Sequence, residues 1–538
     1  MKLEKSTFPA NHNPNDFKAF GPPAMEDGNF ENYKIADMGS FSQGENSKGS
    51  DSNKFYHAAV VQSKINGKWY VYFEWGRVGA TNPQFQFTEC CDENQAQSIF
   101  AAQCHEKNDK RGVWTTIAGK RTLTAKPGKD VYLVRQLATR SCGLPDCKTI
   151  KYTEDIKKIV KTPKLKSSIK IDPISAKLLA DLSGGTISYT RGAMADSSIP
   201  SQTAIDYARD ILTAAQKRLL IVGDDFDSQI ADRDLRDYSA ELYRRIPKKK
   251  PIGTPDEVWI LSQNNILSWQ SDLDAFESAL NLETTENEEV SDPYYGLPIS
   301  MEWLDPKSEI GQFMYYWWPK ATANKHYNLR ELKVKNIWKI SRNGDHEKLI
   351  ATQERIIKDN PKISHKPLFQ PNERVDVISS EKERYIKSNT GLLHHGTRSA
   401  NLIGLMKENF RQPKELTGVV ITGAMFSGCG GGTYLADDIK KSAGYTSLAG
   451  SYWSKGSGGI KSRDAFMLTC DVVLGEPHLA PGPHPYIKPP NGTHCIFGKG
   501  RNALAYTSGK EYSGVENNEW IVFNKHQTEM RYLVEFSQ

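Results

Sequence analysis

The chain has 538 residues and a mass of 60.4 kDa, more than one hydrophobic core usually serves, so we expect two to four domains. Apolar residues make up 38% and charged residues 25% of the chain, which excludes global disorder. The net charge of +6 neither requires nor excludes a polyanionic partner. No run approaches the roughly 18 apolar residues of a membrane span, and the N-terminus lacks the apolar core of a secretory signal, so we expect a soluble, intracellular protein without a membrane partner.

Residues 1–50 are rich in Asn, Ser, Gly and Pro and poor in aliphatic side chains, which predicts a disordered tail. From Phe55 onward, aromatic and β-branched runs separated by turn residues predict a small antiparallel sheet, and the spacing over 93–107 predicts a helix. We therefore expect one β-rich module over 51–150. Its predicted strands are 55–62, 68–75, 85–90 and 130–137.

Positive charge is concentrated in one stretch of the chain. Between Lys107 and Lys170 there are 17 lysines and arginines against five acidic residues, so twice the net charge of the whole chain lies in 64 residues. Such clustering is typical of phosphate binding. A solvated surface followed by a lysine-rich linker, which we predict at 151–169, would give the same count.

The apolar spacing becomes helical over 170–290, which predicts an all-α bundle. Ser201 is a good N-cap for a first amphipathic helix, a second apolar stripe begins at Ile230, and a third helix is expected from Thr254. From 291 to 538 the pattern is mixed and mostly β, which predicts a split or barrel-like antiparallel sheet. The predicted strands there are 331–341, 391–397, 433–437, 465–475, 519–524 and 529–536, with helices near 307–318, 399–409 and 437–445. The expected fold class is α+β and multidomain.

Eight cysteines are sparse for this length, so reduced thiols are expected. Cys90, Cys91, Cys104 and His105 lack the paired spacing of a zinc site, and we predict no metal. The glycine run at 427–432 lacks the GK[ST] and GxGxxG patterns of phosphate-binding loops and leads into a strand. It predicts either a loop beside a pocket or a surface hairpin.

Four polar features interrupt the strands of the last segment: His395–Gly396, Tyr434, Ser442–Tyr445 and Glu519. Each alone is compatible with an ordinary structural role. In this order, within LLHHGTRSANLIGLM, TGAMFSGCGGGTYLADDIKKSAGYT and NNEWIVFNKHQTEMRYLVEF, they resemble the diphtheria-toxin-like ADP-ribosyltransferases, in the poly(ADP-ribose) polymerase branch. EWGRVGA resembles the signature of the WGR domain, and SQTAIDYARDIL and YSAELYRRIP resemble the helical regulatory domain of the same family.

The resemblance covers roughly residues 55 to 538 and is greatest to the DNA-dependent members. It implies a WGR nucleic-acid-binding domain over 51–150, a helical regulatory domain over 170–290 and an ADP-ribosyltransferase domain over 291–538. It also implies that NAD+ is the co-substrate and that the acceptors are proteins, including the chain itself.

The site residues that the resemblance implies have distinct roles. Cleavage of the bond from ribose to nicotinamide builds positive charge on the sugar, which a carboxylate stabilises, and Glu519 takes this role. Gly396 and Ser442 clamp the carboxamide, and Tyr445 stacks on the nicotinamide ring. The catalytic set is Glu519, His395 and Tyr434, and the NAD+-binding set is His395, Gly396, Ser442, Tyr445, Tyr434 and Arg411.

Three positions depart from the family pattern. His394 stands where many members have tryptophan, Ala424 where some have tyrosine, and the glycine run is longer than expected. Donor access and acceptor choice therefore stay open. The sequence also does not decide whether the chain transfers single ADP-ribose units or builds ADP-ribose chains.

In the WGR-like segment, Trp75 and Arg77 lie beside the basic stretch. Arg77 is expected to contact phosphate and Trp75 to stack on a terminal base or sugar, a mode suited to DNA strand breaks. The alternative is that Trp75 anchors the core and Arg77 is an ordinary surface residue.

These features predict a DNA-break-activated ADP-ribosyltransferase of the DNA damage response, in which the helical domain loosens to admit NAD+. Asp272 is expected to face the donor pocket in the closed state. The alternatives are a mono-ADP-ribosyltransferase, a DNA-end-binding scaffold with an inactive transferase fold, and an NAD+ glycohydrolase. The expected location is the nucleus for a eukaryotic chain and the cytoplasm for a bacterial one.

Overall fold

The computed structural model forms two compact units, which are described separately. The first unit comprises residues 1–159 and 190–280, and the second comprises 160–189 and 281–538. The residues that the structure describes are 7–13, 16–21, 24, 29–42, 52–78, 80, 83–126, 129–135, 171–194, 199–223, 225–248, 263–286, 294, 297–323, 329–360, 374–410, 426, 432–448, 464–484, 486–502 and 512–538.

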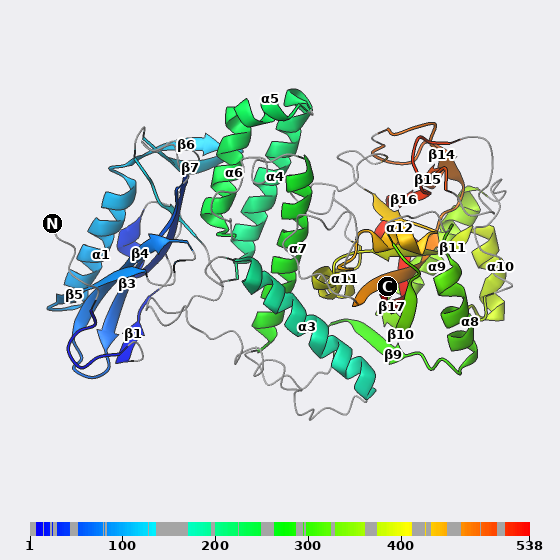
Figure 1. Ribbon diagram of the computed structural model, residues 1–538, viewed down its shortest axis with the longest axis horizontal. Helices are drawn as coiled ribbons and strands as arrows, with labels where there is room; N and C mark the ends of the chain where they lie inside the picture. Colours follow the sequence, from blue (N-terminus) through cyan, green and yellow to red (C-terminus); the bar gives the residue numbers. More distant parts are fainter. Residues whose placement is uncertain are drawn as a thin grey trace. The chain divides into compact units, whose positions relative to one another are not determined.

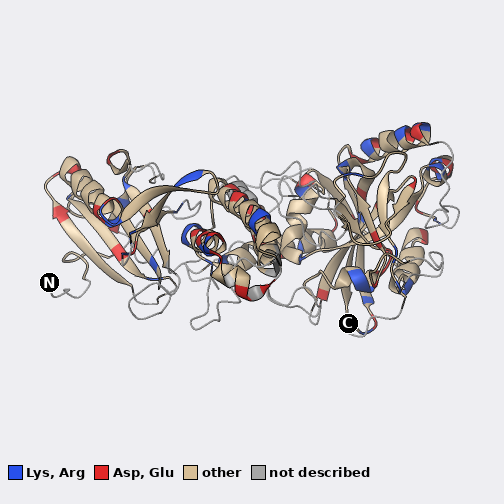
Figure 2. Ribbon diagram, turned by 90° about the horizontal axis from the view of Figure 1, so that it is seen from above, with Lys and Arg blue, Asp and Glu red and all other residues tan. Residues whose placement is uncertain are grey.

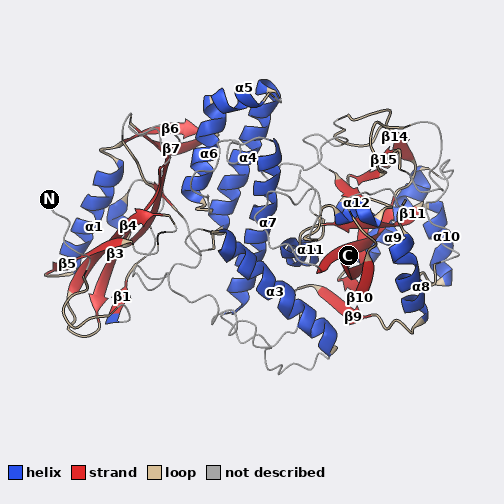
Figure 3. Cartoon of the chain, viewed as in Figure 1, coloured by secondary structure: helices blue, strands red, loops and turns tan. Residues whose placement is uncertain are grey.

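The first unit contains a six-stranded antiparallel sheet with one helix, α1 (Glu93–Asn108), on one face (Figures 1 and 3). Asp92 caps α1 by accepting a hydrogen bond from the Gln95 backbone N–H at 2.8 Å. Phe100 and Cys104 of the helix are buried against the sheet. The strands are β1 (Phe17–Ala19), β2 (Ile35–Ser42), β3 (Ser52–Ser63), β4 (Trp69–Arg77), β5 (Gln84–Cys90) and β8 (Leu133–Val134).

Two strands of this sheet lie inside the segment that composition predicted as a disordered tail. β2 pairs with β3 from Ile35 to Ser42, and β1 pairs with the other end of β3. The prediction of disorder over 1–50 is therefore wrong for these strands. The few apolar residues of the segment, Phe17, Ile35 and Met38 among them, are buried because β3 supplies both hydrogen bonds and packing surface. The hairpin of β6 (Gly112–Ile117) and β7 (Lys120–Ala125) was not predicted either.

The helical segment follows the predicted periodicity closely. Ser201 caps α4, Gly223 ends that helix with a φ of +85°, and the predicted stripe from Ile205 to Leu219 is buried. The second predicted helix is split into α5 and α6 by Asp232, which caps α6. The predicted third start at Thr254 lies outside the described residues. The helices are α4 (Gln202–Val222), α5 (Phe226–Ala231), α6 (Arg233–Arg245) and α7 (Gln263–Glu286).

A further helix, α3 (Pro173–Ala193), lies within the segment 170–290 that was predicted to be all-α, although no separate helix was predicted at these residues. Two adjacent glycines, at 184 and 185, weaken its intrinsic propensity. Contacts within the second unit offset this low helix propensity. Among them, Thr186 Oγ1 donates a hydrogen bond to the Ala400 carbonyl at 3.3 Å. Residues of α3 up to Tyr189 belong to the second unit and the rest to the first. The predicted linker at 151–169 lies outside the described residues.

The second unit is built on two sheets, which confirms the expected split, mainly antiparallel architecture and the α+β fold class. One sheet has the order β11-β13-β17-β10-β9 and the other the order β12-β16-β15-β14, and only β14 and β15 are parallel among these pairs. The strands are β9 (Ile299–Trp303), β10 (Lys333–Arg342), β11 (Thr390–Gly396), β12 (Thr433–Leu435), β13 (Asp464–Val473), β14 (Pro477–Leu479), β15 (Cys495–Gly498), β16 (Glu519–Val522) and β17 (Thr528–Ser537).

Short helices surround these sheets: α8 (Glu309–Trp317), α9 (Asp345–Asp359), α10 (Ser379–Lys387), α11 (Leu402–Glu408) and α12 (Ile439–Ala443). The sequence predicted neither α9 nor α10, nor the strands β9, β14 and β15. Charged residues of both signs are interspersed along the described helices (Figure 2). Among the helices of the described ranges, none combines the length and the apolar character that crossing a bilayer requires.

Candidate active site

The predicted donor-site residues come from three segments that are far apart in the sequence and meet where the two sheets of the second unit join. β11 carries His395 and Gly396, β12 and α12 carry Tyr434 and Ser442, and Glu519 begins β16. A backbone bridge between His394 and Ala436, with N···O distances of 2.8 and 2.9 Å, ties one sheet to the other. Figure 1 shows β11, α12 and β16 gathered in this region.

His395 is fixed by its backbone partner on the next sheet. Its Nδ1 lies 3.0 Å from the Tyr434 carbonyl oxygen, and its ring meets the Phe410 ring edge-on at 4.8 Å between centroids. A carbonyl oxygen only accepts, so Nδ1 carries the proton and Nε2 is an acceptor. Burial lowers the pKa of His395, which keeps the ring neutral. A neutral ring in this tautomer suits hydrogen bonding to a sugar hydroxyl.

Gly396 and Ser442 are in direct backbone contact. A Cβ at position 396 would collide with the Ser442 carbonyl group, so only glycine fits there. Ser442 Oγ donates to the His394 carbonyl at 3.2 Å. Asp438 caps α12 through the backbone N–H groups of Lys440 and Lys441. The end of β11 and the helix α12 therefore form one rigid clamp.

Two tyrosines line the same region. The Tyr434 hydroxyl accepts a hydrogen bond from the Phe426 backbone N–H at 3.0 Å. Burial, followed by the nearby Glu519 carboxylate and Tyr434, raises the pKa of Tyr445. Tyr445 is therefore a neutral phenol beside the carboxylate, as a stacking partner for a flat ring requires.

Glu519 forms an ion pair with Lys441, a residue that was not predicted to belong to the site. The side chains of Glu519 and Lys441 are only 15% and 9% exposed. The lysine compensates the burial of the carboxylate and holds it in one position. A basic residue directly before the serine of KKSAGY was the signal that could have identified Lys441.

A second buried carboxylate, Asp437, was also missed. It is 4% exposed, and burial raises its pKa to about 6. Its Oδ2 accepts hydrogen bonds from Asn518 Nδ2 at 2.7 Å and Trp520 Nε1 at 3.3 Å. Both donors are direct chain neighbours of Glu519.

Not every predicted residue belongs to this cluster. Arg411, Ala424 and residues 427–431 of the glycine run lie outside the described residues. Asp272, which the sequence predicted to face the donor pocket, is buried in the helical bundle of the first unit and paired with Lys248, and its position toward the donor site stays a prediction. The Lys248 ammonium also lies 4.0 Å from the Trp269 ring centroid, which holds this pair within the bundle.

The predicted nucleic-acid residues lie at the end of β4 in the first unit. Trp75 is half-buried, donates from Nε1 to Gln84 Oε1 at 2.8 Å and stacks on Tyr56 with 6.4 Å between ring centroids. Arg77 is exposed. Lys107 adds a cation 4.9 Å from the Tyr56 ring centroid. Trp75 is thus partly a core residue, as the alternative interpretation held, while Arg77 is available to a phosphate.

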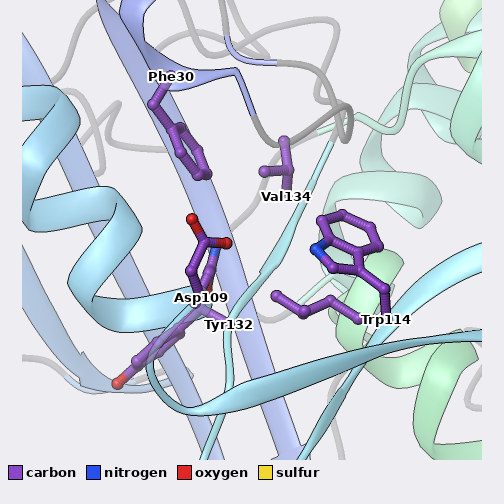
Figure 4. Close-up of a pocket in the computed structure, with 7 residues that line it drawn as sticks. Phe30, Asp109, Trp114, Tyr132 and Val134 are labelled. Atoms are coloured by element: carbon purple, nitrogen blue, oxygen red, sulfur yellow. The ribbon is translucent and has the colours of Figure 1, made fainter.

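A small cavity lies between the end of α1 and the β6–β7 hairpin (Figure 4). It has room for about one water molecule, which is too small for a nucleobase. Among the described residues, no three His, Cys, Asp or Glu side chains gather as metal ligands. The cavity is lined by Phe30, Asn108, Asp109, Trp114, Leu123, Tyr132 and Val134.

Comparison with known families identifies two domains. Residues 319–538 match the poly(ADP-ribose) polymerase catalytic domain, and residues 42–117 match the WGR domain. The chain therefore contains both domains. The described cluster around Glu519 lies in the first match, and Trp75 and Arg77 lie in the second.

Individual relatives align over most of the chain at low identity. Poly(ADP-ribose) polymerase 1 of Danio rerio is 23% identical over 90% of this chain and 43% of its own length, and that of Arabidopsis thaliana is 23% identical over 95% and 47%. Poly(ADP-ribose) polymerase 2-A of Oryza sativa subsp. japonica is 24% identical over 91% of this chain and 68% of its own length. The chain thus spans less than half the length of the two polymerase 1 relatives.

Proposed function

We propose that this chain is a DNA-break-activated ADP-ribosyltransferase that uses NAD+ to modify proteins, including itself. The observation that carries the proposal is the position of Glu519 beside Lys441 and Tyr445, at the sheet junction that also holds the His395–Gly396 and Ser442 clamp. The catalytic-domain match over the same residues supports it.

In the proposed reaction, an acceptor oxygen forms a bond to C1′ of the nicotinamide ribose as the C1′–N bond breaks, and nicotinamide leaves as a neutral molecule with the bonding electron pair. Where the acceptor is a hydroxyl, its proton passes to solvent. The Gly396 backbone and Ser442 Oγ hold the carboxamide, and Tyr445 stacks on the ring, so that the leaving group is oriented. His395 Nε2 accepts from a hydroxyl of the adenosine ribose. Glu519 stabilises the positive charge that develops on the sugar.

The first unit supplies the proposed DNA response. Arg77 and Lys107 offer cations, and the half-buried Trp75, which stacks on the buried Tyr56, offers part of an aromatic ring; together these groups suit a broken DNA end. Within this unit Phe41 of β2 stacks on Tyr243 of α6 with 5.1 Å between ring centroids. We propose that residues 170–290 are the regulatory domain and that DNA binding reaches it through such contacts.

The proposal is tested by incubating the chain with radiolabelled NAD+, with and without nicked or blunt-ended DNA, and separating the products on a gel. We expect label on the protein that increases strongly with cut DNA. A ladder indicates chain formation and one discrete band indicates transfer of single units. Equal labelling with and without DNA contradicts activation, and no labelling with free ADP-ribose as the product indicates a glycohydrolase.

The location of the chain follows from its proposed role. The relatives reported above come from an animal and two plants. We propose a nuclear location in a eukaryotic cell, where broken chromosomal DNA is available. Fractionation of cells that express a tagged chain tests it, and a purely cytoplasmic signal contradicts it.

A further inference from the structure

One buried carboxylate contacts the chain on both sides of Glu519. Asp437 Oδ2 accepts one hydrogen bond from Asn518 and another from Trp520, the residues directly before and after the glutamate. We propose that Asp437 is a positioning residue that fixes the direction of the Glu519 side chain. This inference rests on the proposed function and assigns a role to a residue that does not itself touch NAD+.

The geometry of an extended chain explains why such a contact matters. Asn518, directly before β16, and Trp520, within β16, both reach Asp437, so their side chains lie on one side of the chain. In an extended strand, the side chain of the intervening Glu519 points to the other side. One acceptor that holds both neighbours prevents rotation of the strand about its own axis. That rotation is the motion that would carry the Glu519 carboxylate away from the sugar.

The two donors are themselves held by other parts of the second unit. Asn518 Oδ1 accepts from the Gly500 backbone N–H at 3.0 Å. The Trp520 ring stacks on Phe497 with 3.8 Å between centroids and an interplanar angle of 11°. Asp437 therefore connects the end of β12 to the packed strands β15 and β16, and these contacts restrict the motion of Glu519.

Charge strengthens this arrangement at neutral pH. Burial, opposed by the two hydrogen-bond donors, raises the pKa of Asp437 to about 6, with Asp438 raising it further and Lys441 lowering it. Above that pH the carboxylate is ionised, and hydrogen bonds to an ionised acceptor are roughly twice as strong as neutral ones. Protonation below that pH weakens both contacts at once.

The first test compares Asp437→Asn and Asp437→Ala with the wild type in nicotinamide release, with the full chain and cut DNA. We expect kcat to fall about tenfold for Asn and about 100-fold for Ala, with KM for NAD+ within about twofold, because misplacing a catalytic group affects the transition state. An Ala variant with wild-type kcat, or one that raises only KM, overturns the inference.

A matched control separates positioning from general stability. Glu529→Gln also removes the charge of a buried carboxylate in the second unit, where Glu529 is 2% exposed and pairs with His346. We expect this variant to have a lower melting temperature but wild-type kcat per folded molecule. If it loses as much kcat as Asp437→Asn, the effect of Asp437 is only structural and the inference fails.

A double variant tests whether Asp437 acts through Glu519. We expect Asp437→Asn combined with Glu519→Gln to be no slower than Glu519→Gln alone, because a positioning residue has nothing left to position. A double variant in which kcat falls by the product of the two single-variant losses overturns the inference. This comparison does not depend on how well the alanine variant folds.

The pH dependence of kcat provides the last readout. We expect wild-type kcat to fall toward the Asp437→Asn level as the pH drops below about 6 and the Asn variant to lack this change. If kcat of the Asp437→Asn variant also falls as the pH drops below about 6, the inference is overturned. A wild type that releases no nicotinamide overturns the proposed function together with this inference, whereas an active wild type with an unaffected Asp437→Ala variant overturns this inference alone.

Discussion

The candidate donor site and the candidate DNA-binding face show two different ways of presenting functional groups. The donor site draws on three segments separated by up to about 120 residues, and Glu519 and Lys441 are nearly buried there. The DNA-binding face uses two residues of one strand, and Arg77 is exposed. Bond cleavage requires charges held in a dry, fixed geometry, whereas phosphate binding requires accessible charge. Substitutions at the donor site and at the DNA-binding face are therefore expected to affect turnover and DNA binding separately.

The largest expected effect is on the donor site. Glu519→Gln removes the charge that we propose stabilises the transition state, and we expect kcat to fall about 10³-fold. Binding of cut DNA is expected to stay at the wild-type level, because the proposed DNA-binding residues lie in another part of the chain. Labelled NAD+ and fluorescence anisotropy with a labelled DNA end measure the two quantities. Wild-type turnover would instead support an inactive scaffold whose chemistry never used Glu519.

Gly396→Ala disturbs the same site through the backbone. The new methyl group collides with the Ser442 carbonyl, which separates β11 from α12, so we expect kcat/KM for NAD+ to fall about 100-fold. Gly482→Ala is the matched control, since a Cβ there meets open space. Steady-state kinetics of both variants check the prediction, and equal behaviour of the two contradicts it.

Arg77→Ala is expected to affect DNA binding rather than NAD+ turnover. We expect the Kd for a DNA end to rise about tenfold and the slope of log K against log salt to fall by about 0.9, as the loss of one phosphate contact requires. Activity without DNA should not change. Arg233→Ala removes an exposed arginine of α6 and serves as the control. Titrations at several salt concentrations measure the slope, and an unchanged slope would show that Arg77 does not contact phosphate.

The smallest expected effect concerns the stability of the transferase unit alone. Hydrogen bonds to Glu529 and Glu381 raise the pKa of His346 despite partial burial. The stabilising contribution of a raised histidine is complete below its unfolded value of about 6.5 and is lost as the pH rises through the folded value. Since His346 is 38% exposed, this contribution stays under about 1 kcal/mol after screening.

His346→Gln should therefore flatten the pH dependence of the melting temperature above pH 6.5 and leave kcat unchanged. Thermal unfolding of both forms in a pH series checks this. A wild-type melting temperature that rises with pH over this range would give the opposite sign and contradict the assignment.

Local patterns predicted those elements that depend on their own residues. The stripe from Ile205 to Leu219 forms a helix because every fourth or third residue is apolar and Ser201 caps its start. The tail prediction failed because β2 depends on β3 for its hydrogen bonds. Although α3 lies in the segment predicted to be all-α, it was not predicted as a separate helix, because packing rather than propensity offsets its glycines. Composition does not report contacts with distant segments.

The sequence by itself determined the residue types of the donor site, because their order along the chain resembles a known family and their chemistry suits glycosidic bond cleavage. Only the tertiary structure decided that Lys441 neutralises Glu519 and that Asp437 holds Asn518 and Trp520. These partners are about 80 residues away from the groups they serve. The carboxylates become buried, and their partners come within contact distance, only when the two sheets pack together. Burial makes such partners necessary.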